Sequence, residues 1–343
     1  MSNTLLTQVR ALLTIDIDSM DQNAAARLTQ GSTLFKDMTS NQAIVHGQAT
    51  LQWDHLSPAV VEYVRANGLD ISSEEDILKI INYLTVLLAK QVLPYLTGRV
   101  HAQTSPSIAY DTQKTVDHAR ALVALFEAHG VPKDRVCIKI LATPESIIAC
   151  QRLEAPEIGI RTLATCLFSV SQAVAASQAG CLYVAPYFNE LRVHFQPPGT
   201  TYNDPLRKHP VIPVISSIVQ AFKELGSKTL VMPASIVSLD EIIALTKLGP
   251  DHLTISATIL EEMAKPSTAV EEGALNPVTS GVDLSNEILR TNYLADGGKV
   301  LAEAIDNDAE TTRKLKDALL IFGEMEQRTK EFLRKDEALA IKA

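Results

Sequence analysis

Short apolar runs alternate with longer amphipathic stretches along almost the whole chain of 343 residues. An apolar run of four to eight residues is typical of a buried strand, whereas apolar residues recurring every three to four positions indicate a helix. Eight runs are predicted to form strands: 12–18, 34–39, 99–103, 136–142, 162–168, 181–187, 229–235 and 252–256. Helical stretches between them include 115–129, 144–153, 169–179, 215–225 and 239–248. Eight strands alternating with helices predict an α/β fold of the (β/α)8 type, a TIM barrel.

A doubly wound open sheet is the alternative fold for such an alternation. That fold usually has a glycine-rich turn after its first strand, and residues 18–21 of this chain contain no glycine. Residues 41–98 form an unusually long connection, rich in helix formers, which predicts extra helices. The charged amphipathic stretch 309–334 predicts a C-terminal helix packed across the barrel. We therefore expect a single barrel domain spanning residues 1–343.

Composition and charge narrow the functional classes. The net charge of −9 argues against a nucleic acid or an anionic membrane as a partner. No apolar run reaches the roughly 18 residues of a membrane span, and the N-terminal residues lack the basic start and apolar core of a signal peptide. The four cysteines form no C-x-x-C pair, and no Cys/His cluster has metal-ligand spacing. We expect a cytoplasmic protein that uses no metal and no other cofactor.

One lysine, Lys139, interrupts the apolar run 136–142. Burial favours the neutral amine and lowers its pKa, and a neutral buried amine is the nucleophile that forms Schiff bases with carbonyl compounds. The alternative is a lysine at a strand end whose ammonium reaches water. In a barrel of this type the chemistry lies where strands end. Hydrogen-bonding side chains occupy these positions in other strands as well: Asp18, Thr39, Asn41, Gln103, Thr165, Tyr187 and Ser235.

At these residues the sequence resembles the transaldolase family of class I, Schiff-base aldolases, through nearly the whole chain. Residues 36–41 (KDMTSN) are similar to the family's D-A-T-T-N-P, and 109–112 (AYDT) to its L-S-Y-D-T. Residues 136–142 (VCIKILA) resemble R-I-L-I-K-L-A around the Schiff-base lysine. Further matches lie at 159–169, 231–235 and 252–255. The resemblance implies a (β/α)8 barrel with the lysine on the fourth strand.

The resemblance also implies a role for each matched residue. Lys139 is the expected nucleophile and Asp18 the carboxylate beside it. Thr39 and Asn41 are expected to bind substrate hydroxyls. Thr165 is expected to hold the catalytic water, and Ser235 to contact the far end of the substrate.

Three departures resemble fructose-6-phosphate aldolase, a small relative of the transaldolases. The family's acid/base glutamate is Gln103 here, its phenylalanine after the sixth strand is Tyr187, and the adjacent serine is Ala185. The stretch 183–189 (YVAPYFN) is similar to Y-V-A-P-Y-V-N of that enzyme. In such a site the tyrosine transfers protons, while glutamine and threonine position a water.

A second departure concerns phosphate. The family's arginine after the sixth strand falls on Glu190, and its basic residue after the seventh falls on Val237. Other cations would have to replace them in binding a sugar phosphate: Arg192, His194, Arg207 or Lys208. Losing the two cations removes charge-assisted hydrogen bonds worth roughly 1.5–3 kcal/mol each. We therefore expect a reduced dependence on phosphate.

A third departure lies one layer deeper. Asp16 and His101 each precede a site residue by two positions, so their side chains point into the barrel. On its own, His101 is more typical of a hydrogen-bonded core histidine than of a catalyst. Because a buried pair is tolerated better than a lone charge, we predict that Asp16 and His101 meet beneath Lys139, directly or through one water.

These residues predict a class I aldolase that forms or cleaves the C–C bond between a small ketone donor, of the dihydroxyacetone class, and an aldehyde. One alternative is a true transaldolase whose substrates are sugar phosphates, held by cations of the 192–208 loop. Another is a non-catalytic barrel kept as a scaffold, against which the retention of Lys139, Asp18, Asn41 and Thr165 argues. The expected partners are small molecules, and a homodimer is the one assembly we consider.

Overall fold

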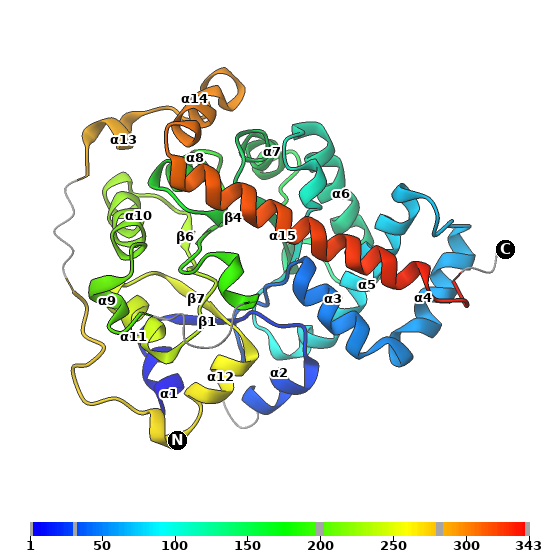
Figure 1. The fold of residues 1–343 in the computed structure, drawn as a ribbon, viewed down its shortest axis with the longest axis horizontal. Coiled ribbons are helices and arrows are strands. Elements are labelled where there is room, and N and C mark those ends of the chain that lie inside the picture. The colour runs from blue at the N-terminus through cyan, green and yellow to red at the C-terminus, as the bar shows by residue number, and fades with distance from the viewer. Residues whose placement is uncertain (1–2, 30–32, 196–201, 279–283, 340–343) are drawn as a thin grey trace.

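The computed structural model describes residues 3–29, 33–195, 202–278 and 284–339. Parallel strands close into a barrel, whose labelled strands lie left of the middle in Figure 1. The strands are β1 (Thr14–Ile17), β2 (Val100–Gln103), β3 (Val136–Leu141), β4 (Thr162–Leu167), β5 (Tyr183–Pro186), β6 (Leu230–Val231) and β7 (His252–Ile255). Between β1 and β2 the segment 35–38 takes the place of a strand, because Met38 bridges both Ile17 and Val100. Counting this segment, eight strand positions surround the core.

Barrel closure rests on two contacts between distant parts of the chain. β1 pairs with β7 in parallel along its whole length, from Thr14↔His252 to Ile17↔Ile255. β6 reaches β7 through backbone hydrogen bonds from Asp251 N to Val231 O and from Thr254 N to Pro233 O. The predicted (β/α)8 fold is therefore confirmed.

The helices surround the barrel, and polar N-caps fix where several of them begin. For example, Thr143, Ser169 and Ser238 accept hydrogen bonds at the starts of the helices after β3, β4 and β6. The helices are α1 (Leu5–Arg10), α2 (Gln22–Thr29), α3 (Gln42–Leu51), α4 (Trp53–Asn67), α5 (Glu74–Val92), α6 (Thr112–Ala128), α7 (Pro144–Glu154), α8 (Val170–Gln178), α9 (Pro205–Lys208), α10 (Ile212–Leu225), α11 (Leu239–Leu248), α12 (Ala257–Met263), α13 (Asn286–Arg290), α14 (Ala295–Asp306) and α15 (Ala309–Arg334). Within the described ranges there are also five short 3-10 helices: η1 (Leu93–Tyr95), η2 (Pro106–Ile108), η3 (Lys133–Arg135), η4 (Leu191–Phe195) and η5 (Pro266–Thr268).

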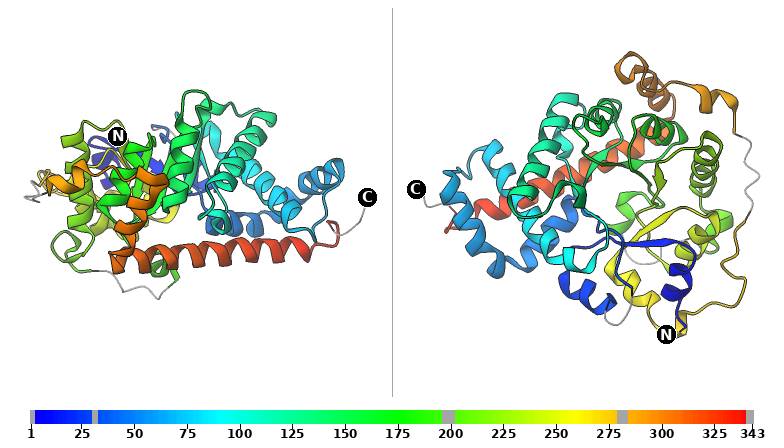
Figure 2. Two further views of the ribbon diagram at one scale, coloured as in Figure 1. Left: turned by 90° about the horizontal axis from the view of Figure 1, so that it is seen from above. Right: turned by 180° about the vertical axis from the view of Figure 1, so that it is seen from behind.

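The C-terminal helix α15 crosses the barrel face, as the sequence predicts. It runs from the side of α14 to α4 in Figure 1 and lies along one side of the molecule in Figure 2. It packs against α3, α5, α14, η2 and β4. Its apolar face, with Leu315, Phe322 and Met325 buried, points to the protein. The predicted single domain over residues 1–343 stays a prediction.

The long connection 41–98 contains the extra helices α3, α4 and α5, as predicted. By length and composition, one helix of the described chain, Glu74–Tyr95, could also cross a membrane. Ten of its residues are buried, and it packs against α3, α4, α6 and α15. A buried core helix passes the same test, so its apolar character is explained by packing.

Candidate active site

A cavity of about 270 Å³ opens at the ends of the barrel strands, around the side chain of Lys139. We call it the chamber. Five of the eight sequence-predicted site residues line it: Asp18, Asn41, Lys139, Tyr187 and Ser235. Eight further residues line it, among them Phe195 from η4 and Phe322 from α15, which the sequence analysis did not name, and His194 from η4, which it named as a possible phosphate-binding cation. The C-terminal helix therefore supplies part of the chamber wall.

Lys139 lies in the middle of β3, where every residue is buried, and only 2% of its surface is exposed. Burial lowers the pKa of its ammonium below the usual 10.5, and the negative charge of Asp18 opposes this shift. The prediction of a buried lysine with a lowered pKa is confirmed, and the alternative of a lysine reaching into water is wrong. An amine of this kind has an increased neutral fraction, which is the form that attacks carbonyl carbons.

Asp18 is held by a chain of hydroxyl groups. Thr39 Oγ1 donates a hydrogen bond to Asp18 Oδ1 at 2.6 Å, and Thr39 Oγ1 lies 2.5 Å from Thr254 Oγ1. Because the Thr39 proton points to the carboxylate, Thr254 must donate to Thr39. The chain fixes the carboxylate beside the chamber. Thr39 is buried within this series of hydrogen-bonded groups and does not line the chamber.

Tyr187 and Thr165 meet on the opposite side of the barrel, where Thr165 Oγ1 donates to the phenol oxygen at 3.2 Å. Burial raises the pKa of Tyr187 well above its usual 10, so the phenol is protonated at neutral pH. A register shift in β4 between Ala164 and Leu167 accompanies a positive φ of 54° at Cys166. This bulge brings the Cys166 thiol close enough to Lys139 and Tyr187 to influence their pKa values.

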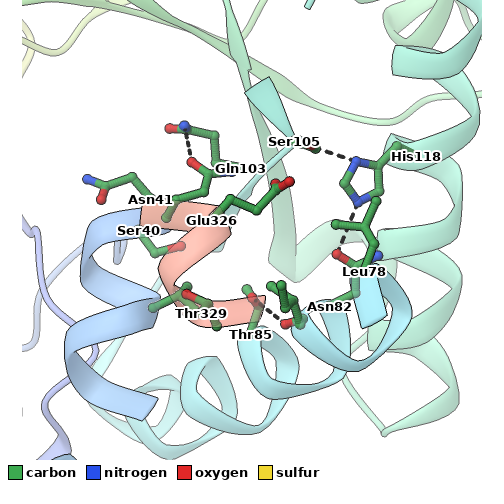
Figure 3. Close-up of a pocket in the computed structure, with 13 residues that line it drawn as sticks. Ser40, Asn41, Leu78, Asn82, Thr85, Gln103, Ser105, His118, Glu326 and Thr329 are labelled. Carbon is green, nitrogen blue, oxygen red and sulfur yellow. Dashed lines mark hydrogen bonds between the residues drawn. The ribbon is translucent and has the colours of Figure 1, made fainter. Parts of the chain in front are cut away.

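Gln103 is buried at the end of β2, and its position pairs with Lys139 of β3. Its side-chain Nε2 donates to Gln42 Oε1 of α3. Gln103 does not line the chamber; it lines a separate cavity of about 20 Å³, together with Asn41, Glu326 and His118 (Figure 3). A cavity of this volume holds about one water.

Asn41 and Ser235 both have structural partners. Asn41 Oδ1 accepts from the backbone N–H groups of Ala43 and Ile44, which caps the start of α3. Ser235 has a positive φ of 63°, and its Oγ lies 2.8 Å from His194 Nε2. Burial lowers the pKa of His194, so its imidazole is neutral near pH 7. His194 therefore enters the chamber as a neutral hydrogen-bonding group.

The cations named as substitutes for the phosphate-binding residues have other partners or lie outside the chamber. Arg192 forms an ion pair with Asp317 of α15, with Nε 2.7 Å from a carboxylate oxygen. Glu190 accepts two hydrogen bonds from Arg313, also on α15. Arg207 is 84% exposed and faces Asp204. Lys208 does not line the chamber, and residues 196–201 of the predicted phosphate loop lie outside the described residues.

The predicted contact between Asp16 and His101 is wrong, because each binds a different partner. His101 Nε2 lies 2.9 Å from Asp37 Oδ2, and His252 Nδ1 lies 2.8 Å from Asp16 Oδ2. Asp37 joins the two pairs, because its backbone N–H donates to Asp16 Oδ1 at 2.8 Å. The Tyr183 phenol hydrogen-bonds to Asp37 as well. We call these five buried residues the floor network.

The floor network lies one layer beneath the site. Asp16, Asp37 and His252 each precede a member of the Asp18–Thr39–Thr254 chain by two positions. That spacing is a sequence signal that could have identified Asp37 and His252. No comparable signal marks Cys166, because strand alternation places it on the opposite face from Thr165. Among the described residues, no three His, Cys, Asp or Glu side chains are placed to hold a metal ion.

Together, the fold and the chamber define an α/β barrel built around a buried lysine of lowered pKa. The sequence profile described as "Transaldolase/Fructose-6-phosphate aldolase" matches residues 14–322, and the chain belongs to this family. Transaldolase of Saccharomyces cerevisiae is 31% identical over 324 residues, covering 94% of this chain and 92% of the yeast protein. Transaldolase of Aliivibrio salmonicida is 29% identical over 323 residues, covering 92% of this chain and 98% of its own. A protein named "Probable transaldolase" from Drosophila melanogaster is 32% identical over 270 residues, covering 78% of each chain. The chain is thus an enzyme of the transaldolase and aldolase type.

Proposed function

We propose that this protein is a Schiff-base aldolase. It forms or cleaves the C–C bond between a small ketone donor, of the dihydroxyacetone class, and an aldehyde. Lys139 carries the proposal, because its buried amine lines a chamber that also contains Asp18 and Tyr187. Lys139 attacks the donor carbonyl to give a carbinolamine. Asp18 assists this step and keeps the amine oriented. No metal or cofactor is needed in this scheme.

Tyr187 supplies the proton for the next step. Its raised pKa means that the phenol starts protonated. The phenol proton passes through a water to the carbinolamine hydroxyl, the C–O bond breaks, water leaves, and the lysine nitrogen's electron pair forms the iminium. Tyr187 is then a phenolate. In cleavage it takes the proton of the substrate hydroxyl that becomes the aldehyde carbonyl, while the C–C electron pair forms the enamine. In the donor direction it takes a proton from the carbon next to the iminium.

We further propose that turnover depends little on a phosphate group. The support is the charge around the chamber. Of the four side chains named as possible phosphate ligands, His194 lines the chamber, and its lowered pKa keeps the imidazole neutral. Glu190 and Arg192 are each engaged by α15. Ser235 and Asn41 would contact the uncharged hydroxyls of donor and acceptor.

A second candidate is a true transaldolase that transfers a ketol unit between sugar phosphates. One observation favours it: a neighbouring cavity of about 270 Å³, which shares Tyr187 with the chamber, is lined by Arg192 and Lys314. These cations could receive a phosphate if their pairs with Asp317 and Glu310 opened. A non-catalytic scaffold is the third reading.

Borohydride trapping separates the three. Incubation with dihydroxyacetone and borohydride should add one reduced donor to Lys139, detected as a mass increase on the peptide that contains it. Lys139→Ala should abolish both the adduct and any aldol activity. Equal rates with fructose and fructose 6-phosphate support low phosphate dependence, and strong preference for the phosphate supports transaldolase. A protein that is never modified, with any ketone, is the scaffold.

The expectations about ligands, location and assembly are also predictions. We expect only small-molecule substrates as ligands, no nucleic-acid or membrane partner, and a location in the cytoplasm. A homodimer would show as a doubled mass in light scattering.

A further inference from the structure

Two glutamines at the edge of the barrel form a directed chain of hydrogen bonds. Gln42 Nε2 donates to the backbone carbonyl of Thr104 at 3.0 Å, and all the groups involved are buried. A carbonyl can only accept a hydrogen bond, so the Gln42 amide has its nitrogen on this side and its oxygen on the other. Gln42 Oε1 then receives Nε2 of Gln103. The Thr104 carbonyl thus sets the orientation of both amides.

In this orientation Gln103 Oε1 points away from Gln42 and, within the described part of the chain, is left as an unpaired hydrogen-bond acceptor. The oxygen is buried and has no hydrogen-bond partner among the described residues. A buried acceptor without a partner costs about 1–3 kcal/mol, so its presence calls for an external donor. Because Gln103 and Lys139 are paired residues of neighbouring parallel strands, their side chains point to the same, inner face of the barrel.

Both glutamines line the cavity shown in Figure 3. The Gln103 side chain is on the Asn41 side, whereas His118 and Asn82 are at the other end of the cavity. The cavity is lined with polar groups and has room for about one water. The Gln103 amide could therefore also turn towards the polar groups of this cavity. Some residue must hold the amide in place, and Gln42 is the one bonded to it.

We propose that Gln42 is a positioning residue for the proton-transfer water. It holds the Gln103 amide through Nε2, which leaves Oε1 of this inward-pointing side chain to accept one O–H of that water. The water's lone pair and second proton remain for exchange with Tyr187 and the bound donor. This inference rests on the proposed Schiff-base function, and it assigns Gln42 a task that Gln103 alone cannot perform.

Deuterium exchange isolates this step. In D2O, proton NMR follows the loss of the methylene signal of dihydroxyacetone as the enamine forms and is deuterated, and borohydride trapping measures the adduct separately. Per mole of adduct trapped, Gln42→Met should slow exchange about 10- to 100-fold, the cost of a misplaced reacting group. Gln48→Met, on the same helix, is the matched control and should exchange at the wild-type rate.

Two further variants distinguish positioning from general structural support. Gln42→Glu still accepts from Gln103 Nε2 but cannot donate to Thr104, so it should exchange within about threefold of wild type. In a Gln103→Leu background, Gln42→Met should slow exchange by less than about twofold further, because there is no amide left to orient.

Three results would overturn the inference. Gln42→Met could exchange like wild type, it could slow exchange equally in both backgrounds, or Gln42→Glu could be impaired as much as Gln42→Met. Absence of any adduct on wild-type protein would instead refute the proposed function and the inference with it. Thermal melts of each variant show whether it is folded, and Gln42→Glu and the double variant carry the test if Gln42→Met is not.

Discussion

Removing the charge of Asp37 should destabilise the protein strongly, although Asp37 does not line the chamber. The carboxylate is fully buried and accepts hydrogen bonds from His101 Nε2, from the Arg99 N–H at 2.7 Å and from the Tyr183 phenol. These bonds lower its pKa to about 2, against the ordinary 3.8, despite the opposing effect of burial. Since tenfold in proton affinity equals about 1.4 kcal/mol, the lowered pKa corresponds to about 2.5 kcal/mol of stabilisation at neutral pH.

The Asp37→Asn variant loses this contribution and places an N–H2 donor among other donors. We therefore expect a loss of about 3–5 kcal/mol in the free energy of unfolding. For a chain of 343 residues, the entropy of unfolding is roughly 0.7 kcal/mol/K, so the Tm should fall by about 4–7 °C. Asp204→Asn, at an exposed ion pair, is the control and should change stability by less than about 0.5 kcal/mol.

Urea unfolding followed by circular dichroism measures this loss across pH. A folded pKa below the unfolded value means that the stabilisation is fully present above about pH 4 and disappears as the pH falls through about 2. The difference between wild type and Asp37→Asn should therefore be constant from pH 5 to 7 and narrow below pH 4. A loss under about 1 kcal/mol at pH 7, or a difference that grows in acid, would refute the role given to the floor network.

Three other predictions concern the site and its support. Tyr187→Phe should slow aldol turnover about 10²–10⁴-fold, and undiminished turnover would contradict the proton-transfer role. The rate of adduct formation at Lys139 should rise with pH and level off below the 10.5 of an ordinary lysine, because burial lowers its pKa; a rise that continues past pH 10.5 would show an ordinary amine. Gly98→Ala should cost at least about 2 kcal/mol in chemical denaturation, because a Cβ there would overlap Asp37 Oδ1 and lie 2.7 Å from Lys36 O. Gly47→Ala, in α3 with nothing within 4 Å, should be neutral or stabilising.

The barrel and its lysine could be predicted because their signals are local. The run around Lys139 is apolar throughout, and the helix expected at 309–334 is observed as Ala309–Arg334. The partners of buried charges could not be predicted from such local signals. Equal depth suggested that Asp16 would meet His101, whereas the structure pairs side chains from adjacent strands through Asp37.

Other site features depend on contacts that no local pattern records. The bulge at Cys166 breaks the alternation of β4, so strand periodicity gives the wrong face for that thiol. Phe322 reaches the chamber from a helix whose residues are far away in sequence, and its apolar periodicity predicts burial without naming the surface. The Gln42–Gln103 bond likewise joins residues separated by 61 positions.

The floor network also bears on how the chain is made. Asp16 is translated early, but its partner His252 follows 236 positions later. At a synthesis rate of about 5–20 residues per second, roughly 10–50 s separate the two. During that interval Asp16 has no counter-charge from the last strand, and burying it would be costly. Closing the barrel before β7 is made would bury the Asp16 carboxylate without its His252 partner, so this cost disfavours closure over an incomplete set of strands.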